Sequence, residues 1–420
     1  MLRIVQALDG GICRIKLPGG LLTADQADAI AQAAQVYAGG VIEATNRANL
    51  QIRGIVGEHG SLVEVLLAAG LGPRQAAGDD VRNLLLSPAA GLDCLQLLDV
   101  RPLAAQILAS LEQEPRLHAL SAKFAIQLDG GEALAMLEHH HDVWLSPVIL
   151  DGACWMAFGL AGCPGLDPAV GAVPVAAAHA LLLAVLDEFL ALATPEQHRL
   201  RDLLDGTGIG GFVDRLSAQP LGIRAVDFQR AAVTAVPLGV HAQRQPGHSL
   251  VVVGAPLGRL DAEQLRGAAA LARNLGDGTL RITPWQGLLL PGVASADAAL
   301  VQQSLAALGW LVDPAQPLAS LIACTGSSGC AKGLADTKGD ALRLATTLQN
   351  PTAVHLSGCA RSCAAAHVAP ATLLAVGHGY YDLYLRDATQ PGFGALHATH
   401  ITVQEAGALL DARSRSNTHD

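Results

Sequence analysis

Hydrophobic and polar positions in the first part of the chain form a pattern that returns in its second half. When the sequence is shifted against itself, the segment 18–54 aligns with 256–292 without a gap. In each copy the pattern predicts a strand, a Pro/Gly turn, an Ala-rich amphipathic helix that begins near Thr23 or Asp261, a Gly turn and a second strand. The positions that keep their residue type are Pro18, Gly20, Leu22, Ala24, Gln26, Ala31, Ala34, Gly40, Thr45, Leu50 and Gly54.

The repeat predicts a duplicated α/β (α+β) fold. Each copy is one half-domain, and the two copies are expected to complete each other's sheet about a pseudo-two-fold axis. A longer α/β segment follows each half-domain. The expected units are a half-domain at 1–56, an α/β domain at 57–225, a half-domain at 226–294, an α/β domain at 295–411 and a disordered tail at 412–420.

The most hydrophobic stretch, 172–193, is predicted to be a buried helix rather than a membrane span. It contains Pro174, His179, Asp187 and Glu188, whereas a membrane span carries few or no charges. Half of the whole chain is hydrophobic, but aromatic residues make up only 3% of it. This composition is typical of a compact, soluble protein with small side chains at many packing positions, so no membrane partner is expected.

The charge of the chain excludes one class of function. A formal net charge of −10 argues against nucleic-acid binding, which needs a basic face. The first ten residues are too few and too polar for a signal peptide, so a cytoplasmic location is expected. In such a protein the eight cysteines are expected to be metal ligands or buried thiols rather than disulfides.

The strongest chemical signal is a pair of cysteine motifs. Cys324 and Cys330 enclose five residues, and Cys359 and Cys363 enclose three, with small residues between them. Four thiolates in two short loops can hold one iron–sulfur cluster. A structural zinc usually has two to four residues between its paired ligands, so it fits less well, and two disulfides are a further alternative. The other cysteines are predicted to be ordinary buried thiols: Cys13, Cys94, Cys154 and Cys163.

A polar stripe is the second signal. If 45–54 is a strand, alternate side chains share a face. That face would carry Thr45, Arg47, Asn49, Gln51 and Arg53, whereas the second copy has Thr283, Trp285, Gly287, Leu289 and Pro291 there. Such a face is either solvated surface or a site. The asymmetry favours a site that holds a ligand with several carboxylates, with Arg82 and Lys123 as weaker additional candidates.

Histidines form a third, weaker signal. The run His139–His141 is predicted to be a solvated loop, because neighbouring side chains diverge and rarely meet at one metal ion. The alternative, in which one of the three is a ligand, stays open. His355 and His367 flank the second cysteine pair, so they lie close to it in sequence.

The two cysteine motifs, the Thr45–Gly54 stripe and the duplication together resemble the sulfite/nitrite reductase superfamily over nearly the whole chain. The resemblance implies two ferredoxin-like half-domains and two larger α/β domains. It implies that Cys324, Cys330, Cys359 and Cys363 hold a [4Fe–4S] cluster. It also implies that a tetrapyrrole is held by Arg47, Asn49 and Arg53, with Arg82 as a further candidate.

Within the superfamily the chain is most similar to the aerobic cobalamin-pathway monooxygenases, on the runs 8–20, 281–286 and 354–363. This resemblance implies hydroxylation of precorrin-3A by O₂ at C20, with an NAD(P)H-linked electron donor and a mononuclear non-haem iron of unassigned ligands. The alternatives are a sirohaem-dependent sulfite or nitrite reductase and a non-catalytic tetrapyrrole carrier. The chain lacks the Lys-x-Lys pair of the reductases, and the sequence around His367 is longer than the family's usual one.

Overall fold

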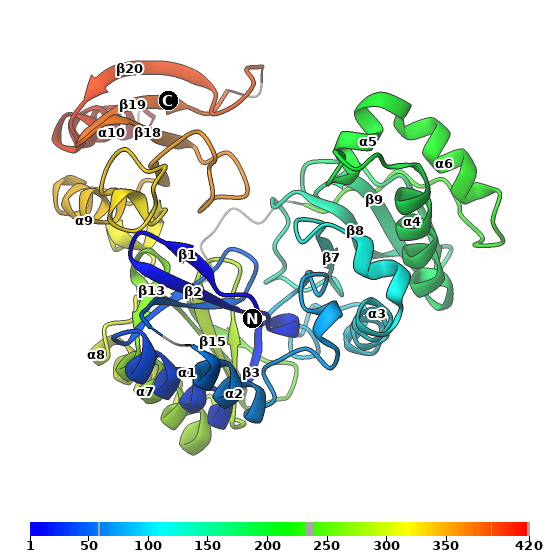
Figure 1. Ribbon diagram of the computed structural model, residues 1–420, viewed down its shortest axis with the longest axis horizontal. Coiled ribbons are helices and arrows are strands. Elements are labelled where there is room, and N and C mark those ends of the chain that lie inside the picture. Colours follow the sequence, from blue (N-terminus) through cyan, green and yellow to red (C-terminus); the bar gives the residue numbers. More distant parts are fainter. Residues whose placement is uncertain (58, 232–237, 388, 418–420) are drawn as a thin grey trace.

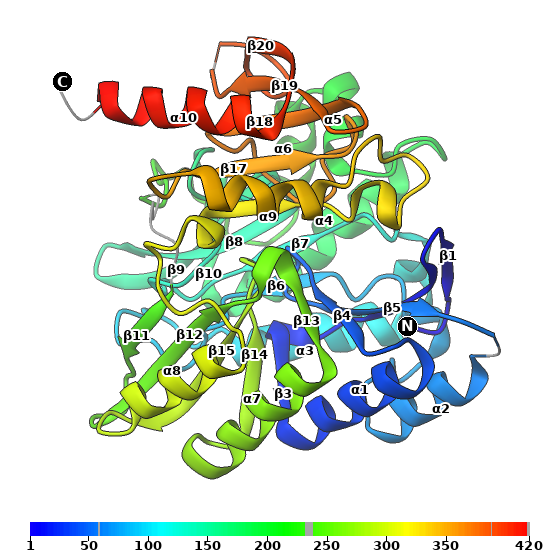
Figure 2. The same ribbon diagram turned by 90° about the vertical axis from the view of Figure 1, so that its left-hand side faces the viewer.

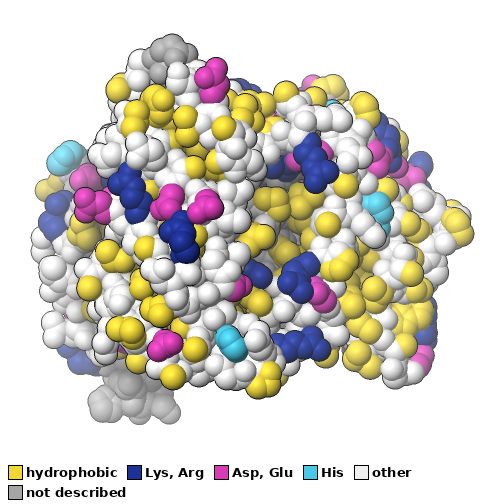
Figure 3. Space-filling view, turned by 90° about the horizontal axis from the view of Figure 1, so that it is seen from below, with side chains coloured by type: hydrophobic (Ala, Val, Ile, Leu, Met, Phe, Trp, Pro, Cys, Tyr) yellow, Lys and Arg dark blue, Asp and Glu magenta, His cyan; other side chains and the backbone are white. Residues whose placement is uncertain are grey.

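Strands form four five-stranded sheets in this computed structural model, which describes residues 1–57, 59–231, 238–387 and 389–417. The two half-domains lie together below the C-terminal α/β domain, and the first α/β domain lies beside them (Figure 1; Figure 2). A hollow between the lobes is visible from below, with Lys and Arg side chains around it (Figure 3). The predicted α/β duplication is therefore confirmed.

The two half-domain sheets exchange one strand each. Sheet order is β1-β2-β5-β4-β13 in the first and β11-β12-β15-β14-β3 in the second, so each sheet ends on a strand from the other copy. Leu22 of β3 pairs with Leu280, and Leu260 of β13 pairs with Ile42. The strands are β1 (Val5–Ala7), β2 (Gly10–Ile15), β3 (Leu21–Thr23), β4 (Val41–Ala44), β5 (Leu50–Ile55), β11 (Gly239–Ala242), β12 (His248–Gly254), β13 (Arg259–Asp261), β14 (Thr279–Ile282) and β15 (Gly287–Ala294).

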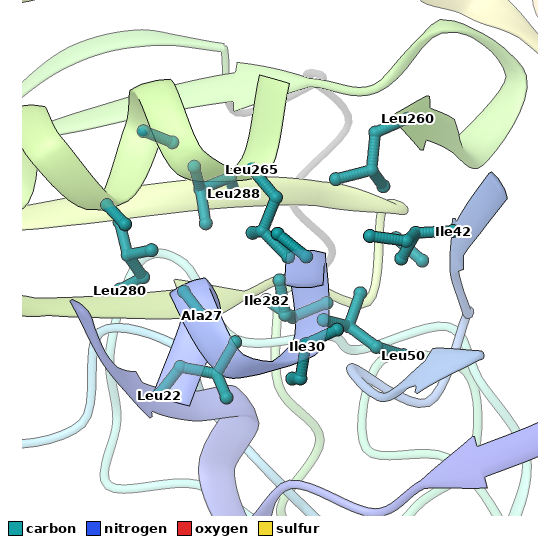
Figure 4. Packing of buried hydrophobic residues seen from close by; sticks show 14 of the residues in the cluster. Leu22, Ala27, Ile30, Ile42, Leu50, Leu260, Leu265, Leu280, Ile282 and Leu288 are labelled. Atoms are coloured by element: carbon teal, nitrogen blue, oxygen red, sulfur yellow. The ribbon is translucent and has the colours of Figure 1, made fainter. Parts of the chain in front are cut away.

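Helices α1 (Ala24–Tyr37) and α7 (Ala262–Leu275) pack against each other and against these sheets. Both begin with a capping box, formed by Thr23 and Gln26 in α1 and by Asp261 and Gln264 in α7. Apolar side chains from both copies meet in one core (Figure 4), where each fully buried leucine or isoleucine contributes roughly 1.5–3 kcal/mol. The half-domains therefore form one folding unit.

The half-domains extend beyond the boundaries that the sequence suggested. Helices α2 (Gly60–Ala68) and α8 (Ala298–Ala307) follow residues 56 and 294, yet their buried leucines and valine belong to the half-domain core. The third boundary is also displaced: Arg230 still donates its backbone N–H to Pro164 in the first α/β domain. The reason is that these segments bury apolar or hydrogen-bonding surface against the preceding unit.

The two larger domains repeat one topology as well. In each sheet the first three strands in chain order run parallel to one another, and each of the last two pairs antiparallel with the strand before it. The first contains β6 (Leu84–Leu86), β7 (Ile126–Leu128), β8 (His141–Leu150), β9 (Ala153–Gly162) and β10 (Gly171–Pro174), with α3 (Arg101–Gln113), α4 (Ala178–Leu192), α5 (Leu200–Thr207) and α6 (Ile209–Ser217). The second contains β16 (Leu321–Ala323), β17 (Val354–Ser357), β18 (Ala371–Gly377), β19 (Tyr380–Leu385) and β20 (Ala395–Ile401), with α9 (Thr337–Thr347) and α10 (Val403–Asn417).

Two expectations concern single segments, the apolar stretch at 172–193 and the tail at 412–420. Val175–Leu192 is long and apolar enough to cross a membrane, but α4 within it packs Leu181, Val185 and Phe189 into the core of the first α/β domain. The tail expected to be disordered from residue 412 is instead helical as far as Asn417. Residues 418–420 lie outside the described part of the chain.

Candidate functional site

The four cysteines of the paired motifs meet at one edge of the C-terminal sheet. Cys324 follows β16 and Cys359 follows β17, and these neighbouring strands run parallel, so their carboxyl ends lie together. Cys330 and Cys363 come later in the same two loops. Burial and then the charges of Cys359, Cys324 and Cys330 raise the pKa of Cys363, so each of these three lies within electrostatic reach of Cys363.

Glycines let the two loops pack closely around Cys324. Gly326 has φ +68°, and a Cβ at this position would lie 2.5 Å from the carbonyl oxygen of Ala335. The backbone N–H of Gly358 donates to Cys324 Sγ at 3.2 Å. A thiolate ligand of a cluster is stabilised by such donors, and they tune its potential.

The donor set fits a polynuclear cluster better than a single zinc ion. Four thiolates on one zinc lie about 3.8 Å apart, because Zn–S bonds are about 2.3 Å long and tetrahedral. Among the residues that the structure describes, the group whose ligand atoms all lie within 4.8 Å of one another contains none of these four cysteines. All eight cysteines of the described chain are free thiols. The two alternatives to a cluster are therefore the weaker fits.

The cysteine loops rest on the first half-domain sheet. Leu8, in the turn between β1 and β2, donates its backbone N–H to the carbonyl oxygen of Gly329 at 3.3 Å. Asn46 Nδ2 donates to the carbonyl oxygen of Ala364 at 3.2 Å, directly after the last cysteine. The β1–β2 and β4–β5 turns of this sheet therefore contact the two cysteine loops.

The predicted strand over 45–54 is only partly a strand. Residues 45–49 form a hairpin turn between β4 and β5, closed by the N–H of Thr45 donating to Asn49 O at 2.9 Å. Ala48 has φ +53°, as Gln286 has φ +59° in the second copy. Thr45 Oγ1 also accepts from two backbone N–H groups of the turn, a local alternative to the extended chain. The single five-residue face was therefore wrong.

Two residues of the predicted stripe serve the protein itself. Arg53 is buried, donates to both carboxylate oxygens of Asp9 at 3.0 Å, and lies 3.6 Å from Glu43. Asn49 Oδ1 accepts the backbone N–H of Leu17 at 2.7 Å. Both side chains position the sheet and its loops, so their direct contact with a ligand stays a prediction.

Arg82 and Lys123, the additional candidates for the ligand site, differ in burial and in their partners. Arg82 is buried between Asp79, at 3.2 Å, and Glu112, at 3.4 Å, and lines a cavity of about 350 Å³ between the first half-domain and α3. Lys123 is exposed. Internal carboxylates thus neutralise Arg82, whereas Lys123 is free to extend the site only if a ligand reaches the surface.

The structure adds two cations that the sequence reading missed. Arg14 lies on β2 opposite Gln51 of β5, and Lys16 follows two residues later, lining the same cavity as Arg82. The alternation of apolar and basic residues in Cys13–Leu17, which is typical of a strand with one polar face, was the signal that could have found them. With Arg47, they form what is called here the cationic wall: Arg14, Lys16 and Arg47.

Carboxylates lie near the cationic wall. Those of Asp79 and Asp80 act on Lys16, whose Nζ donates to the backbone carbonyl of Asp80 at 2.8 Å, and that of Asp142 acts on Arg47. Burial lowers the pKa of Lys16 to about 8, and burial with the neighbouring Arg199 lowers that of Arg47. Burial and the guanidiniums of Arg3 and Arg53 lower the pKa of Arg14. Within the described chain no carboxylate lies within 4.0 Å of the side-chain nitrogens of Arg14 or Arg47. An anionic ligand would stabilise these cations.

The histidine run is not a solvated loop. His139 and His141 are buried, and only His140 is exposed. The His139 ring stacks on that of His367, with centroids 5.3 Å apart. His367 Nδ1 and His355 Nε2 are buried without a hydrogen-bond partner in the described chain. Tertiary contacts thus bring together histidines that the sequence had left separate.

A cavity of about 360 Å³ lies beside this histidine pair. Its walls are mostly apolar and include Trp285 of the second half-domain. His139 and His367 line it together with Ala364, which follows the last cysteine of the motif by one residue. An apolar space with a few polar groups next to the four thiols can admit a small molecule or part of a ring.

Comparison with known proteins defines the class. Residues 6–68 and 241–308 match the nitrite/sulfite reductase ferredoxin-like half domain, and residues 77–224 match the nitrite and sulphite reductase 4Fe-4S domain. The chain belongs to the nitrite and sulfite reductase family, whose members are iron–sulfur oxidoreductases. The second match covers the first α/β domain, whereas the four cysteines lie in its structural counterpart.

Particular relatives are similar to nearly equal degrees. Precorrin-3B synthase of Sinorhizobium sp. is 30% identical over 90% of this chain and 80% of its own length. The ferredoxin–nitrite reductase of Synechococcus elongatus is 30% identical over 86% of this chain and 76% of its own length. The structure of the Mycobacterium tuberculosis NirA protein superposes with a TM-score of 0.79 at 23% identity, over 96% of this chain and 80% of that one, which establishes the fold.

Proposed function

We propose that this protein is a precorrin-3B synthase, which uses O₂ to hydroxylate precorrin-3A at C20 with lactone formation. The observation that carries the proposal is the cationic wall without a lysine pair. Arg14 and Lys16 lie on β2 and directly after it, and Lys16 is close enough to Arg47 for the guanidinium to lower its pKa, so the three cations can meet one ligand with several carboxylates. The similarity to the Sinorhizobium relative supports the same reading.

The sequence around Lys123 also supports the proposed hydroxylation over the reduction of a small oxyanion. The two positions that could pair with Lys123 hold Ser121 and Ala125, and Ala125 is buried and donates its N–H to Asp142 at 2.8 Å. A small bound oxyanion that is reduced by many electrons needs several protons from nearby cations. The sequence has no lysine pair for this purpose, whereas a large polycarboxylate needs only positioning.

We also propose that Cys324, Cys330, Cys359 and Cys363 hold a [4Fe–4S] cluster, which supplies single electrons when bound. Gly358 and the other loop glycines would hold the thiolates in place. A mononuclear non-haem iron, an NAD(P)H-linked donor and a cytoplasmic location belong to the same proposal. In the overall reaction one atom of O₂ enters the substrate and the other leaves as water, with two electrons from the donor.

The second candidate is a sirohaem-dependent nitrite or sulfite reductase, which the similarity to ferredoxin–nitrite reductase favours. One experiment separates the two. Anaerobically purified protein is given precorrin-3A, an electron donor and ¹⁸O₂, and in parallel nitrite or sulfite with reduced viologen. The proposal expects one ¹⁸O atom in the tetrapyrrole product and no ammonium or sulfide. Sirohaem absorption bands with nitrite turnover, and no ¹⁸O incorporation, would replace it with the second candidate.

A further inference from the structure

The start of the long β8–β9 hairpin brings three metal-ligating side chains together, away from the four paired cysteines. His141 pairs with Gly162 in antiparallel register, so the preceding His140 lies opposite the following Cys163. The chain then turns, with the N–H of Asp167 donating to the carbonyl oxygen of Cys163 at 3.0 Å. This turn returns the Asp167 carboxylate to the same place.

The ligand atoms of these three side chains all lie within 4.8 Å of one another. Asp167 Oδ2 accepts the backbone N–H of Cys163 at 2.8 Å and lies 3.8 Å from His140 Nε2. Donor atoms on one tetrahedral ion are about 3.3–3.8 Å apart. The Cys163 thiol is fully buried, whereas the side chains of His140 and Asp167 are 53% and 46% exposed. The spacing of the three ligand atoms is therefore within about 1 Å of what one ion requires.

We propose that His140, Cys163 and Asp167 form a mononuclear site for a divalent transition-metal ion of the Fe²⁺ or Zn²⁺ class. A thiolate, an imidazole and a carboxylate suit such borderline ions, whereas Mg²⁺ and Ca²⁺ prefer oxygen ligands alone. Three protein ligands leave a fourth position, on the exposed side of the group, for water or a small molecule. This inference rests on the side-chain arrangement and does not depend on the proposed reaction.

The two residues that flank His140 in the chain are buried, whereas His140 itself is exposed. His139 lines the 360 Å³ cavity, and the charge of Arg47 in the cationic wall acts on His141. The metal-free alternative is a turn in which the Cys163 thiol donates to Asp167. That turn would need no ion.

Titration with Co²⁺ tests the proposal, because a cobalt–thiolate bond gives a charge-transfer absorption band. The protein is loaded with its iron–sulfur cluster, treated with a chelator, desalted and titrated anaerobically. The wild type is expected to bind one Co²⁺ with this band, and Cys163→Ser to lose the band. His140→Ala, which removes an exposed side chain, should weaken binding at least about tenfold. The matched control Cys154→Ser alters a half-buried thiol on β9 and should bind as the wild type does.

Iron and sulfide analysis of each variant shows whether the cluster is intact, so that its cysteines are not mistaken for the new site. No charge-transfer band in the wild type would overturn the proposal. So would unchanged Co²⁺ affinity in His140→Ala, a result that holds even if Cys163→Ser fails to fold. Neither outcome bears on whether the protein hydroxylates precorrin-3A.

Discussion

Arg53 and Asp9 form a two-pronged ion pair, in which Nε and one terminal nitrogen of the guanidinium each donate to a different carboxylate oxygen at 3.0 Å. Arg53 lies on β5 and Asp9 in the turn between β1 and β2. The same turn contacts the loop of Cys324 and Cys330 through Gly329. The pair therefore links the sheet to the cysteine loops.

Replacement of Arg53 by alanine should destabilise the protein. The change leaves Asp9 without its partner, whereas Glu43 keeps Arg259 at 2.8 Å, and the loss of such charged hydrogen bonds costs about 1.5–3 kcal/mol. The free energy of unfolding from denaturant titration is the measurement. Arg273→Ala, which removes an exposed pair with Asp25, should change it little. Equal stability of the two variants would mean that the Arg53 pair contributes nothing measurable.

Replacement of Cys330 by serine should remove the cluster. Anaerobically purified wild type is expected to contain about four iron and four sulfide per chain for the cluster, and the variant to lose this iron and its broad visible absorption. Cys94→Ser, at an exposed free thiol, should keep both. Full cluster content in the Cys330→Ser protein would exclude this cysteine as a ligand.

The cationic wall should determine tetrapyrrole affinity. Arg14→Ala and Arg47→Ala each remove one charge-assisted contact of about 1.5–3 kcal/mol, which corresponds to roughly a ten- to hundredfold weaker binding of precorrin-3A. Fluorescence titration measures the affinity, and a thermal melt excludes misfolding. The control Arg101→Ala changes an exposed arginine paired with Asp99. Wild-type affinity in a folded Arg14→Ala/Arg47→Ala double variant would show that the ring binds elsewhere.

Glu132 should make stability depend on pH. Burial, assisted by the nearby Asp129 carboxyl, raises the pKa of Glu132 from 4.5 to about 8. The native state then keeps a proton that the unfolded chain has lost, so the free energy of unfolding falls as pH rises from about 4.5 to 8. Glu132→Gln mimics the protonated form, so its advantage over the wild type in the free energy of unfolding should grow with pH. This advantage should be about 1–2 kcal/mol larger at pH 8 than at pH 6.5.

Thermal or denaturant melts at several pH values give this difference. Glu263→Gln, an exposed residue in the first turn of α7, is the matched control and should show no such trend. A constant difference between Glu132→Gln and the wild type across this range would mean that Glu132 is already ionised in the native protein.

The sequence by itself determined the duplication and the grouping of four cysteines into two short motifs. Local pattern suffices for these features, because α1 and α7 begin at the capping residues Thr23 and Asp261 and the cysteines lie in two short loops. It also determined that the apolar stretch at 172–193 is compatible with a buried helix, since charges interrupt it.

Only the tertiary structure decided which charged side chains have a counter-ion in contact and which do not. Arg53 and Arg14 are both arginines on adjacent strands, but Asp9 reaches the first and no described carboxylate reaches the second within 4.0 Å. Likewise, His140 meets Cys163 only through the register of two strands. Ion pairing, burial and cross-strand register depend on residues distant in the chain, so no local pattern could contain them.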